Sequence, residues 1–290
     1  MRSPVLEAAL AAALGPGHAI DSVSRARGGC IHESYVVNSG GERLFVKTNR
    51  AALADAFAAE ADGLEALLEA GARAPRPRAA GIAGDRAYLA MEYLELGGEG
   101  EWPQLGRMLA SLHRATGARF GWRRDNFIGS TPQRNPAHDD WSAFWREARL
   151  LPQLELAARN SLGARLVDAG TRLAEALPGL LAGHAPQPSL LHGDLWSGNA
   201  AFIAGGSPVL FDPAVYYGDR EADLAMTELF GGFPGAFYAA YRDAWPLAPG
   251  YALRRELYNL YHVLNHANLF GGGYAPQAQS MTERLLSEIG

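Results

Sequence analysis

Alternation of apolar and polar positions dominates the first 95 residues and predicts a sheet. Residues 20–26, 34–38, 43–48, 78–82 and 87–93 read as strands, separated by segments rich in glycine or proline. Apolar residues recur at helical spacing within residues 55–70, ending before a glycine, and an amphipathic helix is predicted over residues 5–14, before the strands. The pattern predicts a small lobe, residues 1–95, with a five-stranded antiparallel sheet plus helix.

Helical periodicity replaces alternation after residue 95. Helices are predicted over residues 104–114, 141–158, 162–181, 221–230, 235–245, 251–270 and 276–289. A strand, loop, strand, turn, strand segment over residues 190–212 interrupts them, and residues 125–129 read as a polar loop. The chain is therefore predicted to be α+β and bilobal, with a larger, mostly helical lobe over residues 96–290.

Composition narrows the function classes. A net charge of −5 gives no basic footprint, so nucleic acid and anionic membrane surfaces are not expected as partners. No apolar run reaches the roughly 20 residues that cross a bilayer. Cys30 is the single cysteine and cannot form an intramolecular disulfide, which fits a reducing compartment such as the cytoplasm. Residues His262 and His266 are four apart on a predicted helix, but without carboxylate or cysteine ligands nearby a zinc site is not favoured.

The segment around residues 190–219 carries the candidate chemistry. Asp194 and Asn199 match the spacing of the H-x-D-x-x-x-x-N loop of kinases, and Asp212 follows at the end of the next hairpin. Phosphoryl transfer needs a carboxylate to align the acceptor hydroxyl and oxygen ligands to hold Mg²⁺ beside the phosphates. One aspartate in a turn has an ordinary backbone explanation, whereas these three residues at this spacing predict a phosphotransferase.

A lone lysine is the second signal. Lys47 is the only lysine among 26 Lys and Arg residues, and it lies in a predicted strand. Every other basic residue among these 26 is arginine, so a compact ammonium is predicted to matter at this position. Glu60 lies on the following helix, and a strand lysine tethered by a helix glutamate positions nucleotide phosphates in kinases.

The motifs LLHGDLWSGN, FDPAVYYGDREADLAM and NLYHVLNHANLFGGGY resemble the fructosamine kinase, or ketosamine 3-kinase, family. This resemblance covers nearly the whole chain and is most specific at Trp196 within H-G-D-L-W-x-G-N. One departure is His32, where the family commonly has asparagine. The resemblance implies an aminoglycoside phosphotransferase-like, protein-kinase-like fold. It also implies ATP-dependent phosphorylation of the 3-hydroxyl of ketosamines such as ribulosamine, erythrulosamine or fructosamine adducts, leading to deglycation repair.

Site roles follow from the resemblance, residue by residue. Asp194 is the expected catalytic base, and Asn199 and Asp212 are the expected Mg²⁺ ligands. His192 and Trp196 are expected to contact the substrate. The expected ATP contacts are Gly28, Gly29 and Cys30 over the phosphates, Lys47 with Glu60, and Met91, Glu92 and Tyr93 near the adenine.

Other classes stay open at this point. A kinase for an aminoglycoside, choline or amino-alcohol acceptor is the main alternative, although such cationic acceptors favour sites rich in acids, whereas an indole suits the C–H face of a sugar. A pseudokinase is disfavoured because every group for metal, base and phosphate is present. The substrate is expected to be a free ketosamine or a glycated protein, and the chain a monomer or weak dimer, with a Cys30-linked dimer as one form.

Overall fold

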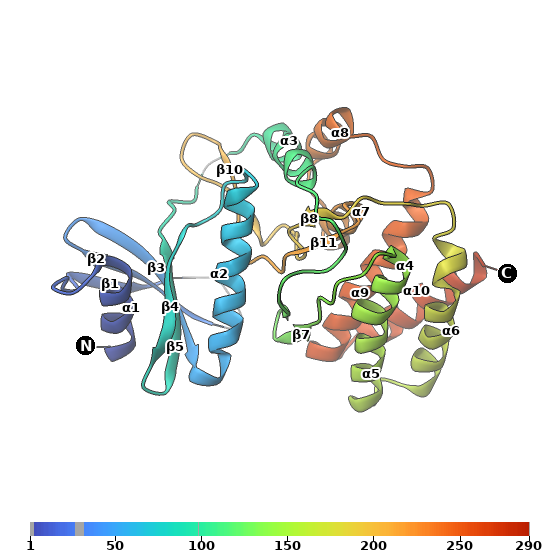
Figure 1. Ribbon diagram of the computed structural model, residues 1–290, viewed down its shortest axis with the longest axis horizontal. Helices are drawn as coiled ribbons and strands as arrows, with labels where there is room; N and C mark the ends of the chain where they lie inside the picture. Colours follow the sequence, from blue (N-terminus) through green and yellow to red (C-terminus); the bar gives the residue numbers. More distant parts are fainter. Residues whose placement is uncertain (1–2, 27–31, 98, 290) are drawn as a thin grey trace. The chain divides into compact units, whose positions relative to one another are not determined.

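The computed structural model describes residues 3–26, 32–97 and 99–289 (Figure 1). The chain forms two compact units. The first, called the sheet unit, holds Met1–Leu105 and Asn199–Pro213, and the second, the helical unit, holds Gly106–Gly198 and Ala214–Gly290. The predicted lobes, divided after residue 95, assign the segment 199–213 to the larger lobe, whereas the chain returns to the sheet unit there.

The sheet unit contains the predicted five-stranded sheet. Its strands are β1 (Ser22–Arg25), β2 (Glu33–Ser39), β3 (Glu42–Arg50), β4 (Pro77–Ala83) and β5 (Arg86–Glu92), in the order β1-β2-β3-β5-β4. All neighbours are antiparallel. The prediction of the sheet is therefore confirmed, and Lys47 occupies the central strand β3, opposite Ser34 and Leu89.

Two helices lie on opposite sides of this sheet, α1 (Pro4–Leu14) and α2 (Ala54–Glu69) (Figure 1). Side chains of α1 pack with Leu44 and Val46 of β3 and with Tyr88 and Ala90 of β5. Because successive side chains of a strand point to opposite faces, Lys47 points away from α1. The alternation in β3 thus directs the lysine toward the face that α2 covers. The hairpin β9 (Ala200–Phe202) and β10 (Pro208–Leu210) completes the sheet unit, and the short 3₁₀ turn η1 (Ala51–Leu53) leads into α2.

The helical unit is built around a core rich in aromatic residues. Its helices are α4 (Trp141–Trp145), α5 (Leu151–Arg159), α6 (Ala164–Leu180), α7 (Glu221–Leu229), α8 (Gly235–Ala244), α9 (Tyr251–Phe270) and α10 (Tyr274–Ser287). The residues of α3 (Trp102–His113) are divided between the two units, with the boundary after Leu105. The predicted helix 141–158 is interrupted by a π-helical turn, η2 (Arg146–Leu150). Trp141, Phe144 and Trp145 pack in the core with Tyr258 and Tyr261 of α9.

Short strands hold the loops of the helical unit. β8 (Ser189–Leu191) pairs with β11 (Tyr216–Gly218), and β6 (Asn126–Ile128) pairs with β7 (Thr131–Gln133). The prediction of a plain polar loop at residues 125–129 was wrong, because most of it forms strand β6. The three strands predicted over residues 190–212 all form, but β8 belongs to a separate sheet from β9 and β10.

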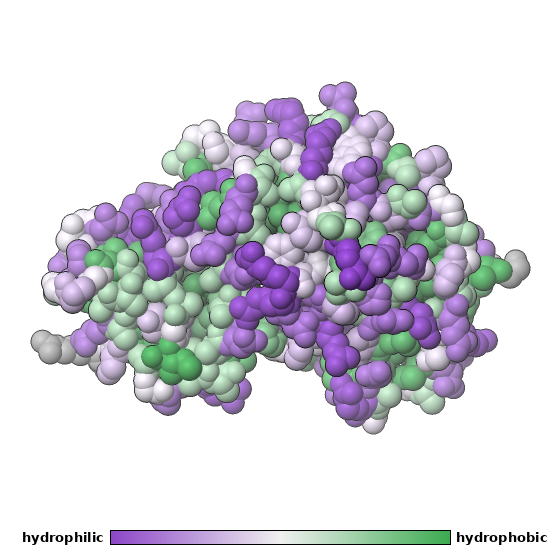
Figure 2. All heavy atoms as spheres, viewed as in Figure 1, coloured by the Kyte–Doolittle hydropathy of each residue, from purple (hydrophilic) through white to green (hydrophobic). Residues whose placement is uncertain are grey.

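Figure 2 shows hydrophilic and hydrophobic side chains interspersed over the face that it draws. None of the helices within the described ranges is both long and apolar enough to span a lipid bilayer.

Candidate active site

The predicted site residues fall into two groups, one in each unit. In the sheet unit, the ammonium of Lys47 lies between two carboxylates. Lys47 Nζ donates a hydrogen bond of 2.6 Å to Glu60 Oε1 on α2 and a second, short one to Asp212 Oδ1 after β10. The side chains of Lys47 and Glu60 are only 9% and 12% exposed, whereas that of Asp212 is 47% exposed. The lysine is therefore fixed from the buried side by Glu60, and its other partner reaches solvent.

This cluster shifts the pKa values of its members. Burial lowers the pKa of Lys47, but the attraction of Asp212 and Glu60 outweighs that cost and raises it above its usual range. Burial raises the pKa of Glu60 to about 7, against the opposing effect of Lys47 and with a further rise from nearby Asp212. Because two acids share one ammonium, Lys47 does not fully offset the effect of burial on Glu60, and Glu60 is the member of the cluster that titrates near neutral pH.

Asn199 and Asp212 lie at the same end of the hairpin β9–β10. The last ladder pair joins Leu210 to Ala200, and the next residue, Phe211, donates its N–H to the Asn199 carbonyl at 3.1 Å. Asp212 has a positive φ of 56°, a backbone conformation that few residues other than glycine adopt. Strand pairing thus brings together the two residues predicted to hold Mg²⁺, although thirteen positions separate them.

The predicted adenine segment has partly structural roles. Met91 is buried in β5, and the Glu92 carboxylate accepts two hydrogen bonds from Arg73, at 2.5 and 2.8 Å. Those bonds lower the pKa of Glu92. Arg43 lies over the ring of Tyr93 with 4.5 Å to the ring centroid. The side chain of Glu92 is therefore engaged by the protein, and contact with adenine stays a prediction for this segment.

Gly28, Gly29 and Cys30 lie outside the described residues. His32, which departs from the family pattern, is described. Its Nδ1 lies 3.0 Å from Asn49 Nδ2 and accepts that amide's hydrogen, and its ring lies 4.8 Å from the ring of Phe57. Burial and the nearby Lys47 lower its pKa to about 4, so the imidazole adds no charge at neutral pH.

In the helical unit, the loop that carries Asp194 is held through its backbone. The N–H groups of His192 and Gly193 donate to the two oxygens of Asp223 on α7, at 2.7 and 2.8 Å. Gly193 has φ 83°, and a Cβ there would lie 2.1 Å from the Ala214 carbonyl oxygen. The glycine of the H-G-D motif is therefore required by a positive φ and a close backbone approach.

His192 holds the loop from inside. Its side chain is completely buried, and its Nδ1 accepts a hydrogen bond of 3.2 Å from the N–H of Asp194. We expected His192 to contact the substrate. That contact stays a prediction, and the buried ring positions the backbone of Asp194.

Trp196 is placed by the next glycine. Its side chain packs over Gly198, where an added Cβ would lie 2.3 Å from the indole. Trp196 nevertheless remains 39% exposed, and its ring centroid lies 6.5 Å from that of Phe230. The W-x-G pattern thus keeps a large apolar ring partly open to solvent, two residues from Asp194.

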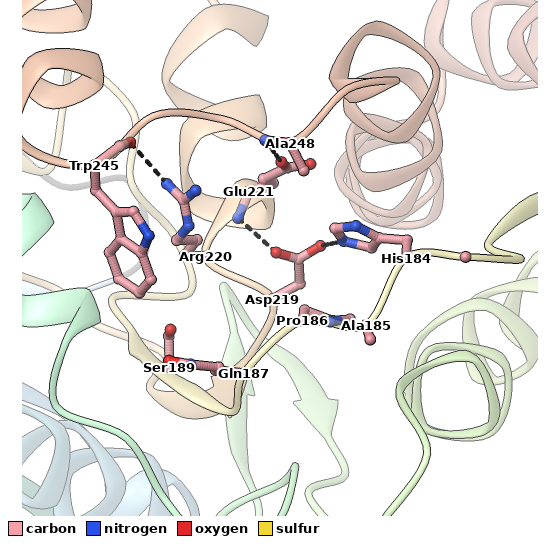
Figure 3. A pocket seen from close by; sticks show the side chains of 11 residues that line it. His184, Ala185, Pro186, Gln187, Ser189, Asp219, Arg220, Glu221, Trp245 and Ala248 are labelled. Atoms are coloured by element: carbon pink, nitrogen blue, oxygen red, sulfur yellow. Dashed lines mark hydrogen bonds and ion pairs between the residues drawn. The ribbon is translucent and has the colours of Figure 1, made fainter.

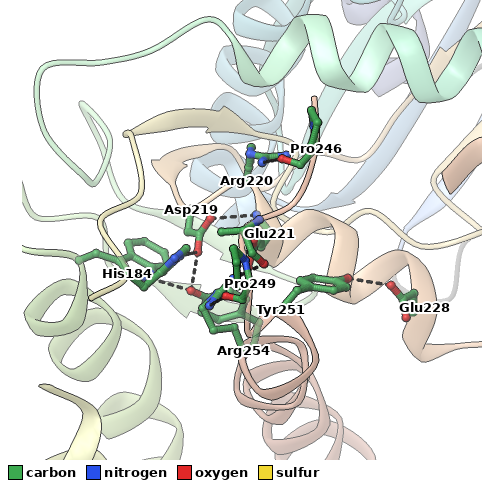
Figure 4. A network of polar contacts seen from close by, with 12 residues as sticks. His184, Asp219, Arg220, Glu221, Glu228, Pro246, Pro249, Tyr251 and Arg254 are labelled. Carbon is green, nitrogen blue, oxygen red and sulfur yellow. Dashed lines mark hydrogen bonds and ion pairs between the residues drawn. The ribbon is translucent and has the colours of Figure 1, made fainter. Parts of the chain in front are cut away.

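Buried acids at the start of α7 support the strands around this loop. The second oxygen of Asp219 accepts hydrogen bonds of 2.6 Å from His184 and from the Tyr258 hydroxyl, and Arg254 binds Glu221 at 2.6 and 3.0 Å (Figure 4). Burial raises the pKa of Asp219, but the bonds from His184 and Tyr258 outweigh it and lower the pKa overall. Asp223 behaves likewise through His113, which also contacts the Tyr241 hydroxyl at 2.8 Å.

His184, Asp219 and Glu221 are also close enough to be considered for a metal, since one ligand atom from each lies within 4.8 Å of the others. They line a cavity of about 420 Å³ (Figure 3). Because protein donors already bind both carboxylates, we interpret this group as a structural network. The prediction that no zinc site lies at His262 and His266 stays a prediction.

Sequence reasoning missed these supporting residues. The available signal was the run D-R-E-A-D at residues 219–223, with three acids within five residues where helix α7 begins. Asn126 was also missed: its amide donates to the Val215 carbonyl at 2.7 Å and accepts from Gln133 at 2.8 Å. It fastens hairpin β6–β7 to the chain that follows Asp212.

Comparison with known proteins identifies the family. The profile of the fructosamine kinase family matches residues 3–288. The chain belongs to the fructosamine kinase family. A Synechocystis protein named "Probable ketoamine kinase" is 49% identical over 89% of this chain and 88% of its own. The chloroplastic protein-ribulosamine 3-kinase of Arabidopsis thaliana is 42% identical, covering 94% of this chain and 85% of its own.

Solved structures of family members match the whole fold. The crystal structure of a candidate fructosamine-3-kinase from Haemophilus somnus 129PT has a TM-score of 0.89 at 28% identity, covering 97% of both chains. A second candidate from Thermobifida fusca has a TM-score of 0.86 at 32% identity, covering 98% of both chains. The aminoglycoside phosphotransferase APH(4)-Ia shares the fold, with a TM-score of 0.59 at 15% identity over 93% of this chain and 94% of its own. The prediction of the fold class and of the family is confirmed.

Proposed function

We propose that this family member transfers the γ-phosphoryl group of ATP to the 3-hydroxyl of ketosamines. The main support for this proposal is the position of the Lys47 ammonium between the carboxylates of Glu60 and Asp212. Asp212 lies at the end of hairpin β9–β10 that also bears Asn199. A fixed cation beside two oxygen-ligand residues suits the binding of phosphates with a divalent metal. The relatives named ketoamine kinase and protein-ribulosamine 3-kinase, at 40–49% identity, support ketosamines as acceptors.

Asp212 and Asn199 are the residues that would hold Mg²⁺. They fit the metal because a carboxylate and an amide carbonyl are hard oxygen donors and lie at one hairpin end. When bound, Mg²⁺ supplies neutralisation of phosphate charge. Lys47, kept in place by Glu60, would turn its ammonium to the phosphates, and the segment Met91–Tyr93 would meet the adenine.

Asp194 is proposed as the base. In the reaction, the acceptor oxygen forms a bond to the γ-phosphorus, the bond from that phosphorus to the β-phosphate oxygen breaks, and ADP leaves. The proton of the hydroxyl passes to the Asp194 carboxylate. Asp223 and His192 hold the backbone around Asp194, and Trp196 would stack on a C–H face of the sugar.

The compartment and assembly are proposals as well. We place the enzyme in the cytoplasm, without nucleic acid or membrane partners, because the chain carries a net charge of −5 and a single cysteine. We propose a monomer or weak dimer, with a disulfide-linked dimer through Cys30 under oxidising conditions. Sedimentation with and without reductant tests the oligomeric state and the disulfide-linked dimer.

ADP formation with ribulosyl-lysine, fructosyl-lysine and kanamycin, each with and without Mg²⁺, tests the function. We expect ADP formation with a ketosamine when Mg²⁺ is present, and no ADP formation with kanamycin. Turnover with kanamycin or a choline-like amine, and none with either ketosamine, would overturn the proposal in favour of a small-molecule amine kinase. Binding of ATP without turnover on any acceptor would indicate a pseudokinase.

A further inference from the structure

A path of aromatic rings leads away from Trp196 across the helical unit. The centroid of the Trp196 ring lies 6.5 Å from that of Phe230, and the Phe230 ring lies 4.7 Å from that of His266. His266 in turn lies 5.5 Å from Phe270 and 5.2 Å from Tyr274. We call these five residues the aromatic strip.

Local structure explains why the strip is continuous. His266 and Phe270 are four positions apart on α9, which places them on one helical face. Gly271 and Gly272 follow with φ of 65° and 62°, and α10 begins soon afterwards at Tyr274. These positive φ values reverse the chain, so the first residue of α10 returns to the His266 ring.

Two side chains of the strip are exposed to solvent. Six large hydrophobic side chains are exposed among the described residues, and the two aromatic ones both belong to the strip: Phe270, 63% exposed, and Trp196, 39% exposed. Neither belongs to the core cluster of the helical unit. Exposed aromatic side chains that adjoin one another mark binding surfaces rather than cores.

The strip is also uncharged. Burial lowers the pKa of His266, so its ring is neutral at neutral pH, and its Nδ1–H donates to the His262 carbonyl at 2.8 Å. The rings of Trp196, Phe230, Phe270 and Tyr274 each contact another aromatic ring of the strip and carry no charge. The five side chains of the strip thus carry no charge, which does not favour a polycationic amine or an anionic lipid head group as their ligand.

We propose that the aromatic strip binds an apolar residue two positions from a glycated lysine in an extended peptide, because residues two positions apart point to the same face. This inference rests on the function proposed above and adds the chemistry of the acceptor beyond the sugar. With the sugar against Trp196, Phe230 is placed for the methylene chain of the lysine. Two residues of extended peptide span about 7 Å. The ring steps from Phe230 through His266 are 4.7 and 5.5 Å, so a large side chain two positions from the lysine reaches Phe270 or Tyr274.

Three ribulosamine acceptors test the proposal: the ribulose adduct on the lysine of acetyl-Phe-Ala-Lys-Ala-Phe-amide, of acetyl-Glu-Ala-Lys-Ala-Glu-amide, and of Nα-acetyl-lysine amide. We expect kcat/KM for the Phe-flanked peptide to exceed that for the Glu-flanked peptide by at least fivefold, through KM, because the strip touches no reacting atom. Phe270→Ala should reduce this ratio by about threefold or more, and Phe270→Tyr should restore it.

Ile82→Ala is the matched control. Ile82 is 57% exposed on β4 of the sheet unit, so the substitution also removes an exposed apolar side chain, but away from the strip. The ratio between the two peptides should stay at its wild-type value in this variant. Melting temperatures of all variants check the fold, and the exposure of Phe270 predicts little change.

The outcomes separate the inference from the function beneath it. If none of the three acceptors is phosphorylated, the proposed function fails and the inference fails with it. If all three are phosphorylated with equal kcat/KM, or if Ile82→Ala lowers the ratio as much as Phe270→Ala, the function stands and the inference is overturned. If Phe270→Ala shifts the protein from dimer to monomer in sedimentation while the ratio stays unchanged, the strip is a self-association surface and the inference is again overturned.

Discussion

The two units hold their candidate chemistry in different ways. In the sheet unit, the chemical groups contact one another directly, because Lys47 bonds both Glu60 and Asp212. In the helical unit, Asp194 is held through the backbone of its loop, by Asp223 and His192. In the sheet unit, the charged groups themselves hold one another in position. In the helical unit, the proposed base is a different residue from those that hold its loop in place. Substitutions in the two units should therefore fail differently.

The largest effect is expected at Asp194. Asp194→Asn should leave the fold and ATP binding unchanged and lower kcat by roughly 10² to 10⁴-fold, because a positioned base contributes about that much. Steady-state ADP release, melting temperature and ATP titration check the three parts. Turnover within a few-fold of wild type would remove Asp194 from the base role.

Asp223 should show the opposite pattern. Asp223→Ala leaves two loop N–H groups and buried His113 without their acceptor, so we expect a loss of about 2 to 4 kcal/mol in the free energy of unfolding, with reduced kcat. Asp168→Ala, at an exposed aspartate of α6, is the matched control. Denaturant titration measures both variants, and equal stabilities for the two would contradict the anchoring role.

Lys47→Arg sharpens the comparison within the sheet unit. Charge is kept, but the planar guanidinium cannot place one point charge between Glu60 and Asp212, so kcat/KM should fall at least tenfold, about 1.4 kcal/mol. The converse change on the surface, Arg78→Lys in β4, should leave the kinetics unchanged. A Lys47→Arg enzyme with wild-type kcat/KM would show that any cation suffices there.

The smallest effect concerns pH. Burial raises the pKa of Glu60 to about 7, so between its unfolded pKa near 4.5 and pH 7 the folded protein keeps a proton that the unfolded chain has released. The free energy of unfolding should therefore decrease as pH rises through this window. Glu60→Gln removes the titration, and the stability difference between wild type and variant, measured without nucleotide from pH 4.5 to 8, should shift against the wild type as pH rises. A flat difference would show that Glu60 titrates normally.

Several local features of the fold followed from the sequence. Alternation along residues 20–93 predicted the five strands, because one face of each strand is buried and the side-chain period is two. Periodicity also located most helices of the larger unit. It missed strands β6, β7 and β11 and the π turn at Arg146–Leu150, since each is short and depends on partners distant in the chain.

The features of the candidate site also divide into those that the sequence predicts and those that depend on partners distant in the chain. By itself, the sequence determined which residue types stand at Lys47, Asp194, Asn199 and Asp212, and the H-G-D-L-W-x-G-N spacing identified the family. Only the tertiary structure decided that Lys47 contacts Asp212 in addition to Glu60, that His192 is buried, and that Asp223 binds the loop around Asp194. The physical reason is distance along the chain: periodicity reports which face of an element is buried, whereas the partners of a buried polar group are chosen when elements up to 165 residues apart pack together.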